Sequence, residues 1–218
     1  DKDAVLVPEN FEKYCDAETA GKLHAFEKKG KLICCAYEMD EGSFLFLEEK
    51  LRQLQESLYQ AAPDMLAQPL QMSTFHMTLH DLANGTPEQL GLQDYMRYTR
   101  ERVSQLLPDW KDAPPLRMET TWMFNMVNTS IVLGLKPADG ESWRRLDEMY
   151  TTLEDVVHLG YALTPHITMG YFLPGTYSSE QVQRLSGVLR NVELDITLDM
   201  KNLVLQEFHD MNHYETVL

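Results

Sequence analysis

Apolar residues recur along the chain with two different periods, one typical of helices and one typical of strands. Between residues 46 and 61, leucines follow one another at intervals of three or four positions with charged residues between them, which predicts an amphipathic helix. Between residues 192 and 200, apolar residues occupy every second position, which predicts a half-buried strand. Along the whole chain the pattern predicts strands at 31–37, 73–79, 116–127, 130–135, 163–172, 192–200, 203–208 and 213–218, and helices at 46–61, 87–107, 139–158 and 178–189.

The predicted elements repeat in the order strand, helix, strand, helix, strand, once in each half of the chain. Such a repeat of architecture favours an α+β fold with two pseudo-symmetric lobes that face a cleft. Residues 1–30 fit neither cycle and are predicted to be an N-terminal extension. Residues 31–218 then form a single domain with lobes at approximately 31–127 and 128–218, and the closing strands allow an exchange between the lobes.

Composition and charge narrow the range of partners. The 218 residues carry a formal net charge of −15, and so acidic a chain repels long nucleic acid, whose binding depends on Lys and Arg. No apolar run approaches the roughly 18 residues that span a bilayer, and the first residues lack the features of a signal peptide. The three cysteines have the spacing of neither a disulfide framework nor a metal finger. We therefore expect a cytoplasmic monomer that binds a short ligand and no membrane.

Two short elements with the pattern His-x-Thr are the candidate site. They are His76/Thr78 and His166/Thr168, and each lies in a predicted strand among apolar residues. On a strand, residues i and i+2 point to the same face, so each histidine projects together with its threonine. An imidazole beside a hydroxyl forms a compact anion site, in which the hydroxyl donates to a phosphate oxygen and the ring exchanges a proton.

The pairing of these elements makes them a stronger signal than either would be alone. About one chance His-x-Ser or His-x-Thr is expected in a chain with seven histidines. Here both copies have threonine, they lie 90 residues apart, and they occupy matching places in the two cycles. In-line displacement at phosphorus needs a base on one side and an acid on the other, each worth about 10²–10⁴-fold in rate. Two histidines from facing lobes supply both.

The residues around both elements resemble a known family. Phe75-His76-Met77-Thr78-Leu79 and Pro165-His166-Ile167-Thr168-Met169-Gly170 are similar to the paired motifs of the two-histidine phosphoesterase superfamily. That LigT-like group includes RNA 2′,3′-cyclic phosphodiesterases, 2′-5′ RNA ligases and cyclic nucleotide phosphodiesterases. The resemblance covers roughly residues 31–218. It implies two antiparallel sheets that flank a central cleft with helices outside, and a reaction without metal or other cofactor. It also implies that the two histidines are the acid–base pair and that the two threonines bind the phosphate.

One position departs from the family pattern. Bacterial ligase-type members often carry an arginine five residues after the second motif histidine, and that place is Tyr171 here. On a regular strand Tyr171 points away from His166, so a substrate-binding role for it requires the strand to end or bend near Gly170. The missing cation and the acidity of the chain argue against RNA ligation. They favour hydrolysis of a small cyclic phosphate or a short oligonucleotide end.

Three alternatives stay open at this point. His76 and His80 have the histidine spacing of a zinc-protease helix, although on a strand they lie about 13 Å apart along the backbone, too far to share one ion. A non-catalytic module of the same fold could bind a nucleotide or RNA end, and a 2′-5′ RNA ligase-like activity is the third alternative. We predict a metal-independent phosphoesterase whose ligand is a small 2′,3′-cyclic nucleotide or a short RNA end.

Overall fold

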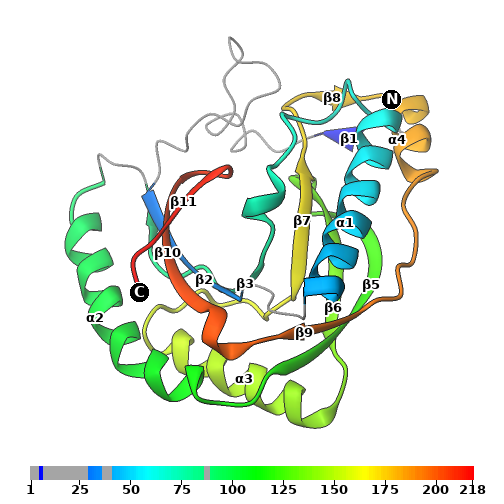
Figure 1. The fold of residues 1–218 in the computed structure, drawn as a ribbon. Helices are drawn as coiled ribbons and strands as arrows, with labels where there is room; N and C mark the ends of the chain where they lie inside the picture. The colour runs from blue at the N-terminus through cyan, green and yellow to red at the C-terminus, as the bar shows by residue number, and fades with distance from the viewer. Residues whose placement is uncertain (1–4, 7–28, 36–40, 86–88) are drawn as a thin grey trace.

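The computed structural model describes residues 5–6, 29–35, 41–85 and 89–218 (Figure 1). The helices are α1 (Glu41–Ala61), α2 (Leu92–Lys111), α3 (Gly140–Glu154) and α4 (Ser179–Ser186). The longer strands are β2 (Lys29–Cys35), β3 (Met77–His80), β5 (Leu116–Met126), β6 (Ser130–Pro137), β7 (His166–Tyr171), β9 (Asp195–Leu198), β10 (Leu203–Asp210) and β11 (His213–Thr216). The short elements are β1 (Val5–Leu6), β4 (Asn84–Gly85), β8 (Thr176–Tyr177) and the 3₁₀ turns η2 (Met72–Thr74) and η3 (Met200–Asn202).

One antiparallel sheet runs through the molecule in the order β11-β10-β2-β3-β7-β6-β5-β9, with β4 paired to β2. The sheet curves around the middle of the molecule, so that β10 and β11 face β7 across it while α2 and α3 lie on the outside (Figure 1). Its two halves meet at β3 and β7, where Met77 pairs with Ile167. The predicted α+β class is confirmed, and the two expected sheets are the halves of this one sheet.

Each half of the sheet contains strands from the other cycle of the chain. The second half takes β5 from the first cycle, which pairs with β6 and β9, and the first half takes two strands from the second cycle, β10, which pairs with β2, and β11, which pairs with β10. The lobe boundary between residues 127 and 128 stays a prediction, and it falls in the turn that joins the paired strands β5 and β6. Most of the predicted extension 1–30 lies outside the described residues; within it, β1 pairs with β8.

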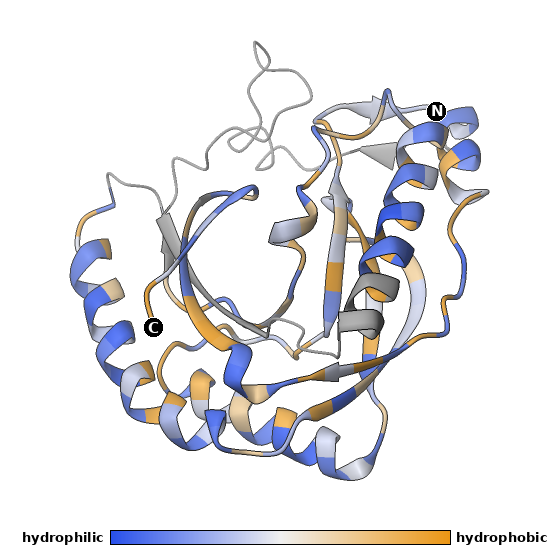
Figure 2. Cartoon of the chain, viewed as in Figure 1, coloured by the Kyte–Doolittle hydropathy of each residue, from blue (hydrophilic) through white to orange (hydrophobic). Residues whose placement is uncertain are grey.

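A single hydrophobic core holds the backs of the strands that carry the two His-x-Thr elements. The leucine stripe of α1 is buried, as its helical period predicts. The same core contains Met77 and Leu79 of β3 and Ile167 and Met169 of β7, and each of these four side chains is 0% exposed. Hydrophilic and hydrophobic residues alternate in bands along α2 and α3, as expected for helices with one buried face (Figure 2). Among the described helices, none is long and apolar enough to cross a membrane.

Several predicted boundaries were wrong by a few residues, and three of them have a clear physical reason. The first His-x-Thr strand begins at Met77 instead of residue 73, because the 3₁₀ turn η2 precedes it. Helix α2 continues through Pro108, which lies in its last turn and removes a single backbone hydrogen bond. The alternating stretch 192–200 forms a strand only over Asp195–Leu198, because β5, its partner, is irregular where the remaining residues would pair.

Candidate active site

The two His-x-Thr elements lie beside each other because β3 and β7 are neighbours in the sheet. The middle residues of the two elements, Met77 and Ile167, are register partners. In an antiparallel pair, the residue before one partner lies across from the residue after the other partner. Each histidine is thereby placed across from the threonine of the other element, and a pseudo-twofold relation passes between the two strands.

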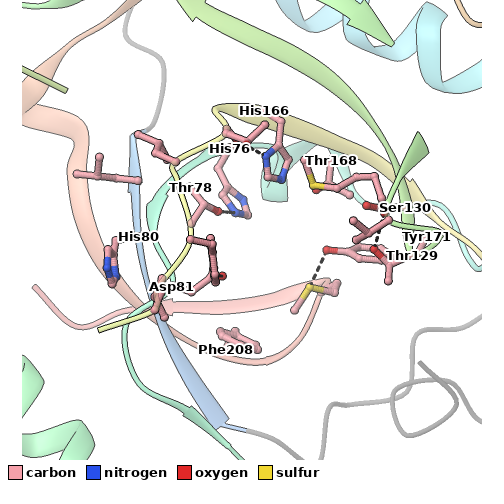
Figure 3. A pocket seen from close by; sticks show the side chains of 18 of the residues that line it. His76, Thr78, His80, Asp81, Thr129, Ser130, His166, Thr168, Tyr171 and Phe208 are labelled. Carbon is pink, nitrogen blue, oxygen red and sulfur yellow. Dashed lines mark hydrogen bonds between the residues drawn. The ribbon is translucent and has the colours of Figure 1, made fainter. Parts of the chain in front are cut away.

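Both elements present their polar side chains to one cavity of about 720 Å³. Because the alternate residues of β3 and β7 are buried in the core, His76, Thr78, His166 and Thr168 turn toward the cavity and line it. The two imidazole rings lie next to each other, with Thr78 beside His76 (Figure 3). The structure therefore brings together all four residues of the two elements.

Each histidine ring is oriented by the carbonyl group two residues before it. Nδ1 of His76 lies 2.6 Å from the carbonyl oxygen of Thr74, and Nδ1 of His166 lies 2.6 Å from that of Thr164. Since a carbonyl oxygen only accepts, each Nδ1 must carry a hydrogen, and each Nε2 is then the nitrogen that exchanges protons. Nε2 of His76 accepts from the hydroxyl of Thr78 at 3.1 Å.

The surroundings of His76 favour its neutral form. Burial lowers the pKa of His76 below its ordinary value of 6.5, the Thr74 carbonyl opposes this shift, and a positive charge on His166 lowers the pKa further. Two imidazolium ions side by side would repel each other. This repulsion disfavours the state in which both rings are protonated, and acid–base catalysis requires only one protonated ring.

Tyr171 also lines the cavity, because β7 is irregular where a regular strand would point this residue away. The register between β6 and β7 shifts at this place, and Met169 and Gly170 are buried in succession instead of alternating. The bend near Gly170 on which a role for Tyr171 depends is therefore present. Its hydroxyl donates to the sulfur of Met211 at 3.1 Å. Burial raises the pKa of Tyr171 to about 12, so the hydroxyl is a neutral donor near pH 7.

The cavity wall also contains residues that the periodicity did not single out. Tyr214 on β11 meets the ring of His76 edge-on, with ring centroids 5.2 Å apart, and its register partner Phe208 lies beside it on β10. Asp81 follows β3, and its carboxylate accepts from the hydroxyl of Tyr161 at 3.0 Å. Aromatic rings beside the histidines offer a surface on which a nucleobase can stack. Tyr214 and Phe208 could have been predicted as cavity residues only if the position of the hairpin of β10 and β11 over the cavity had been known.

The described wall of the cavity carries no fixed positive charge. No lysine or arginine is found among the described residues that line it. Among these described residues, the groups that can bind an anion are the imidazole rings and the hydroxyl groups.

His80 is engaged in structural contacts and does not form a metal site with His76. Its side chain is buried, Nδ1 accepts from the amide of Leu82 at 3.0 Å, and Nε2 donates to the carboxylate of Glu154 at 2.9 Å. Nε2 thus joins the end of β3 to the end of α3, while Nδ1 holds the turn that follows β3. In the part of the chain that the structure describes, no group of three or more His, Cys, Asp or Glu side chains is placed to hold a metal ion.

The chain resembles several solved structures in its fold. No family model and no curated protein matches the sequence. Among solved structures, ATU0111 of Agrobacterium tumefaciens, a conserved protein of unknown function, is 14% identical with a TM-score of 0.56, over 97% of this chain and 99% of that chain. TT0787 of Thermus thermophilus is 13% identical with a TM-score of 0.53, over 87% of this chain and 95% of that chain. Escherichia coli LigT complexed with 3′-AMP is 12% identical with a TM-score of 0.49, over 88% of this chain and 96% of that chain.

Likenesses at these identities concern the backbone and assign neither an activity nor the role of any residue. No assignment of a site residue rests on the LigT structure. The chain shares its fold with ATU0111 and TT0787, and the LigT likeness that its two motifs had led us to expect recurs among its structural neighbours.

Proposed function

We propose that the chain is a two-histidine phosphoesterase that hydrolyses a cyclic phosphate, either a 2′,3′-cyclic nucleotide or a short RNA end. The main support is the register of β3 and β7, which sets the two His-x-Thr elements head to tail on the wall of one cavity. A module that only bound nucleotides would have no need for two rings that each direct Nε2 to proton exchange.

His76 is the base in the proposed reaction, because burial favours its neutral form. Its Nε2 takes a proton from water, and the water oxygen forms a bond to phosphorus. On the opposite side the bond from phosphorus to a ribose oxygen breaks, and protonated His166 gives that oxygen a proton. The product is a phosphomonoester, and proton exchange with solvent returns both rings to their starting states.

Thr78 and Thr168 bind the phosphate in this proposal. Each threonine lies across the strand pair from the histidine of the other element, and in the proposed complex the two hydroxyls donate to the nonbridging oxygens of the phosphate, that of Thr78 in place of its contact with His76. Such donors stabilise the negative charge that grows on these oxygens in the transition state. The hydroxyl of Tyr171 is a third neutral donor on the same wall.

Hydrolysis fits the charge of this cavity better than RNA ligation does. A ligase must hold two RNA ends and their phosphates, and no lysine or arginine is found among the described cavity residues. The two histidines supply both proton transfers, so the proposed reaction needs no metal and no other cofactor.

The test is to incubate EDTA-treated protein with each of the four nucleoside 2′,3′-cyclic monophosphates and to separate the products by chromatography. We expect one monophosphate isomer, because a fixed base and a fixed acid select which ribose oxygen leaves. His76→Ala and His166→Ala should each lower the rate by at least about 10²-fold. His158→Ala is the matched control, since this histidine is exposed and does not line the cavity.

Three other outcomes would contradict the proposal in different ways. Activity retained by His76→Ala or His166→Ala would remove the catalytic assignment. Activity lost in EDTA and restored by a divalent metal would contradict metal independence. Nucleotide affinity without any turnover would support the non-catalytic module instead.

A further inference from the structure

The described residues that line the cavity of the two histidines include one carboxylate, that of Asp81. Asp81 is the sole acidic residue among the described residues that line it, and no lysine or arginine lies beside it there. Apart from the histidine rings, the fixed charge of this wall is therefore negative. A fixed negative charge in a site for phosphate calls for an explanation, because it repels the ligand.

The backbone holds Asp81 in place at some conformational cost. The residue follows directly after β3, and Tyr161 donates a hydrogen bond to its carboxylate at 3.0 Å. The next residue, Leu82, has a φ of 50°, a left-handed conformation that leucine seldom adopts. The amide of Leu82 donates to the buried ring of His80 at 3.0 Å, and this contact keeps the backbone turned. Backbone strain of this kind is found mainly where function requires a particular geometry.

The charge of Asp81 acts on the groups that surround the phosphate position. Burial raises the pKa of Tyr171 to about 12, and Asp81 adds to this increase. At His76, where burial lowers the pKa, Asp81 acts in the opposite direction and favours the proton. A field that favours a proton on His76 must disfavour an anion bound beside that ring, and more strongly so when the anion carries two charges.

We propose that Asp81 selects the ligands of the cavity by charge, so that it tolerates a monoanionic cyclic phosphodiester and expels the dianionic phosphomonoester that its hydrolysis produces. This inference rests on the function proposed above. A phosphodiester carries one negative charge, whereas a monoester, whose second pKa is about 6, carries nearly two at neutral pH. Asp81 thereby speeds product release and limits inhibition by product. Its own contribution to substrate binding is unfavourable, and the histidines and threonines offset it.

The experiment compares two ligands that differ by one charge. Isothermal titration calorimetry at about pH 8 measures the Kd of adenosine 3′-monophosphate, a dianion there, and of its phosphate methyl ester, a monoanion. Coulomb energy is proportional to the product of the charges. If Asp81→Asn tightens the binding of the monoanion by a factor f, it should therefore tighten the binding of the dianion by about f². We expect about threefold tighter binding of the methyl ester and about tenfold tighter binding of the monophosphate. Asp81→Ala should change the preference between the two ligands in the same direction. Because alanine has no amide, this variant separates the loss of charge from any hydrogen bond made by the side-chain amide in Asp81→Asn.

Two variants serve as controls for these measurements. Tyr161→Phe removes the hydrogen bond to Asp81 and keeps the charge, so its preference between the ligands should match that of the wild type. Asp147→Asn removes an exposed charge on α3, outside the cavity, and should also leave the preference unchanged.

Equal factors for the two ligands in Asp81→Asn, or weaker binding of both, would overturn the inference and identify Asp81 as a hydrogen-bond acceptor for the nucleoside. In that case hydrolysis by the wild type would still stand. Failure of the wild type to bind either ligand or to hydrolyse any cyclic nucleotide would overturn both the inference and the proposed function.

Discussion

Hydrogen bonds made by individual residues determine which ring nitrogen of each cavity histidine carries a proton. His76 and His166 are oriented by the same contact, from Nδ1 to the carbonyl oxygen two residues earlier, at 2.6 Å in both cases. The orienting group is a backbone carbonyl in the segment just before each strand, so the contact needs no particular side chain at that place. The matching geometry at two places 90 residues apart leaves Nε2 of both rings as the nitrogen that exchanges protons.

The pH dependence of hydrolysis should report the lowered pKa of His76. The base works only when neutral, and burial lowers its pKa below 6.5, so activity should persist below that pH and then fall about tenfold per unit as the ring takes up a proton. The measurement is kcat/KM for a cyclic nucleotide from about pH 4 to 9. An acid limb centred above 6.5 would show that a different group is the base.

At the scale of the elements, the bulge in β7 turns Tyr171 toward the cavity and requires a glycine beside it. A Cβ atom added at Gly170 would lie 3.1 Å from the hydroxyl of Tyr59, closer than atoms in a well-packed interior normally approach. Tyr59 cannot retreat freely, since its hydroxyl donates to the carbonyl of Ala67 at 2.7 Å. The glycine thus allows α1 to pack closely against the bulge.

Gly170→Ala should therefore destabilise the protein by about 1–3 kcal/mol, the usual cost of overpacking a filled interior. The cost should be smaller in a Tyr59→Phe background, where the hydroxyl that the new methyl group meets is absent. Urea denaturation of the wild type, both single variants and the double variant gives the coupling energy directly. Additive effects would mean that the contact with Tyr59 is not what restricts this position.

The sequence predicted most elements and both His-x-Thr pairs because these features leave a local signal. Periodicity records which face of an element is buried, and the leucine stripe of α1 and the strands around His76 and His166 show it clearly. The register that joins β3 to β7 and the hairpin that brings Tyr214 against His76 depend on pairing between distant segments. No local pattern encodes such pairings. The sequence did not predict the bulge in β7. It indicated only that a substrate-binding role for Tyr171 requires the strand to end or bend near Gly170.

At the scale of the whole molecule, the side chain of Glu154 joins several elements and fixes their relative position. It accepts hydrogen bonds from His80 at the end of β3 and from the amides of Leu159 and Gly160 beyond α3. Burial alone would raise the pKa of Glu154, but these hydrogen bonds outweigh it and bring the pKa to about 2. The ionised carboxylate is therefore favoured more strongly in the folded protein than in the unfolded chain.

Glu154→Gln should lower the thermal unfolding midpoint at neutral pH, and the difference from the wild type should shrink as the pH falls. The sign follows from the depressed pKa: the carboxylate stabilises the fold above its unfolded value of 4.5, and this stability is lost as the pH falls toward about 2. Circular dichroism melts from neutral to acidic pH test this. Glu101→Gln, an exposed acid on α2, provides the comparison. A difference that does not vary with pH would mean that the ionised carboxylate is not the source of the effect.

The exchange of strands between the two halves also bears on the order of events during synthesis. β2 leaves the ribosome early, yet its sheet partner β10 begins only at Leu203, and Phe208 and Tyr214 of the cavity wall come later still. Pairings between segments so far apart form slowly, because a long loop must close before they add stability. A growing chain can therefore contain both His-x-Thr elements without a cavity between them. The proposed hydrolysis would begin only after residues 203–216 have been made and have paired, so a partly synthesised chain would lack it.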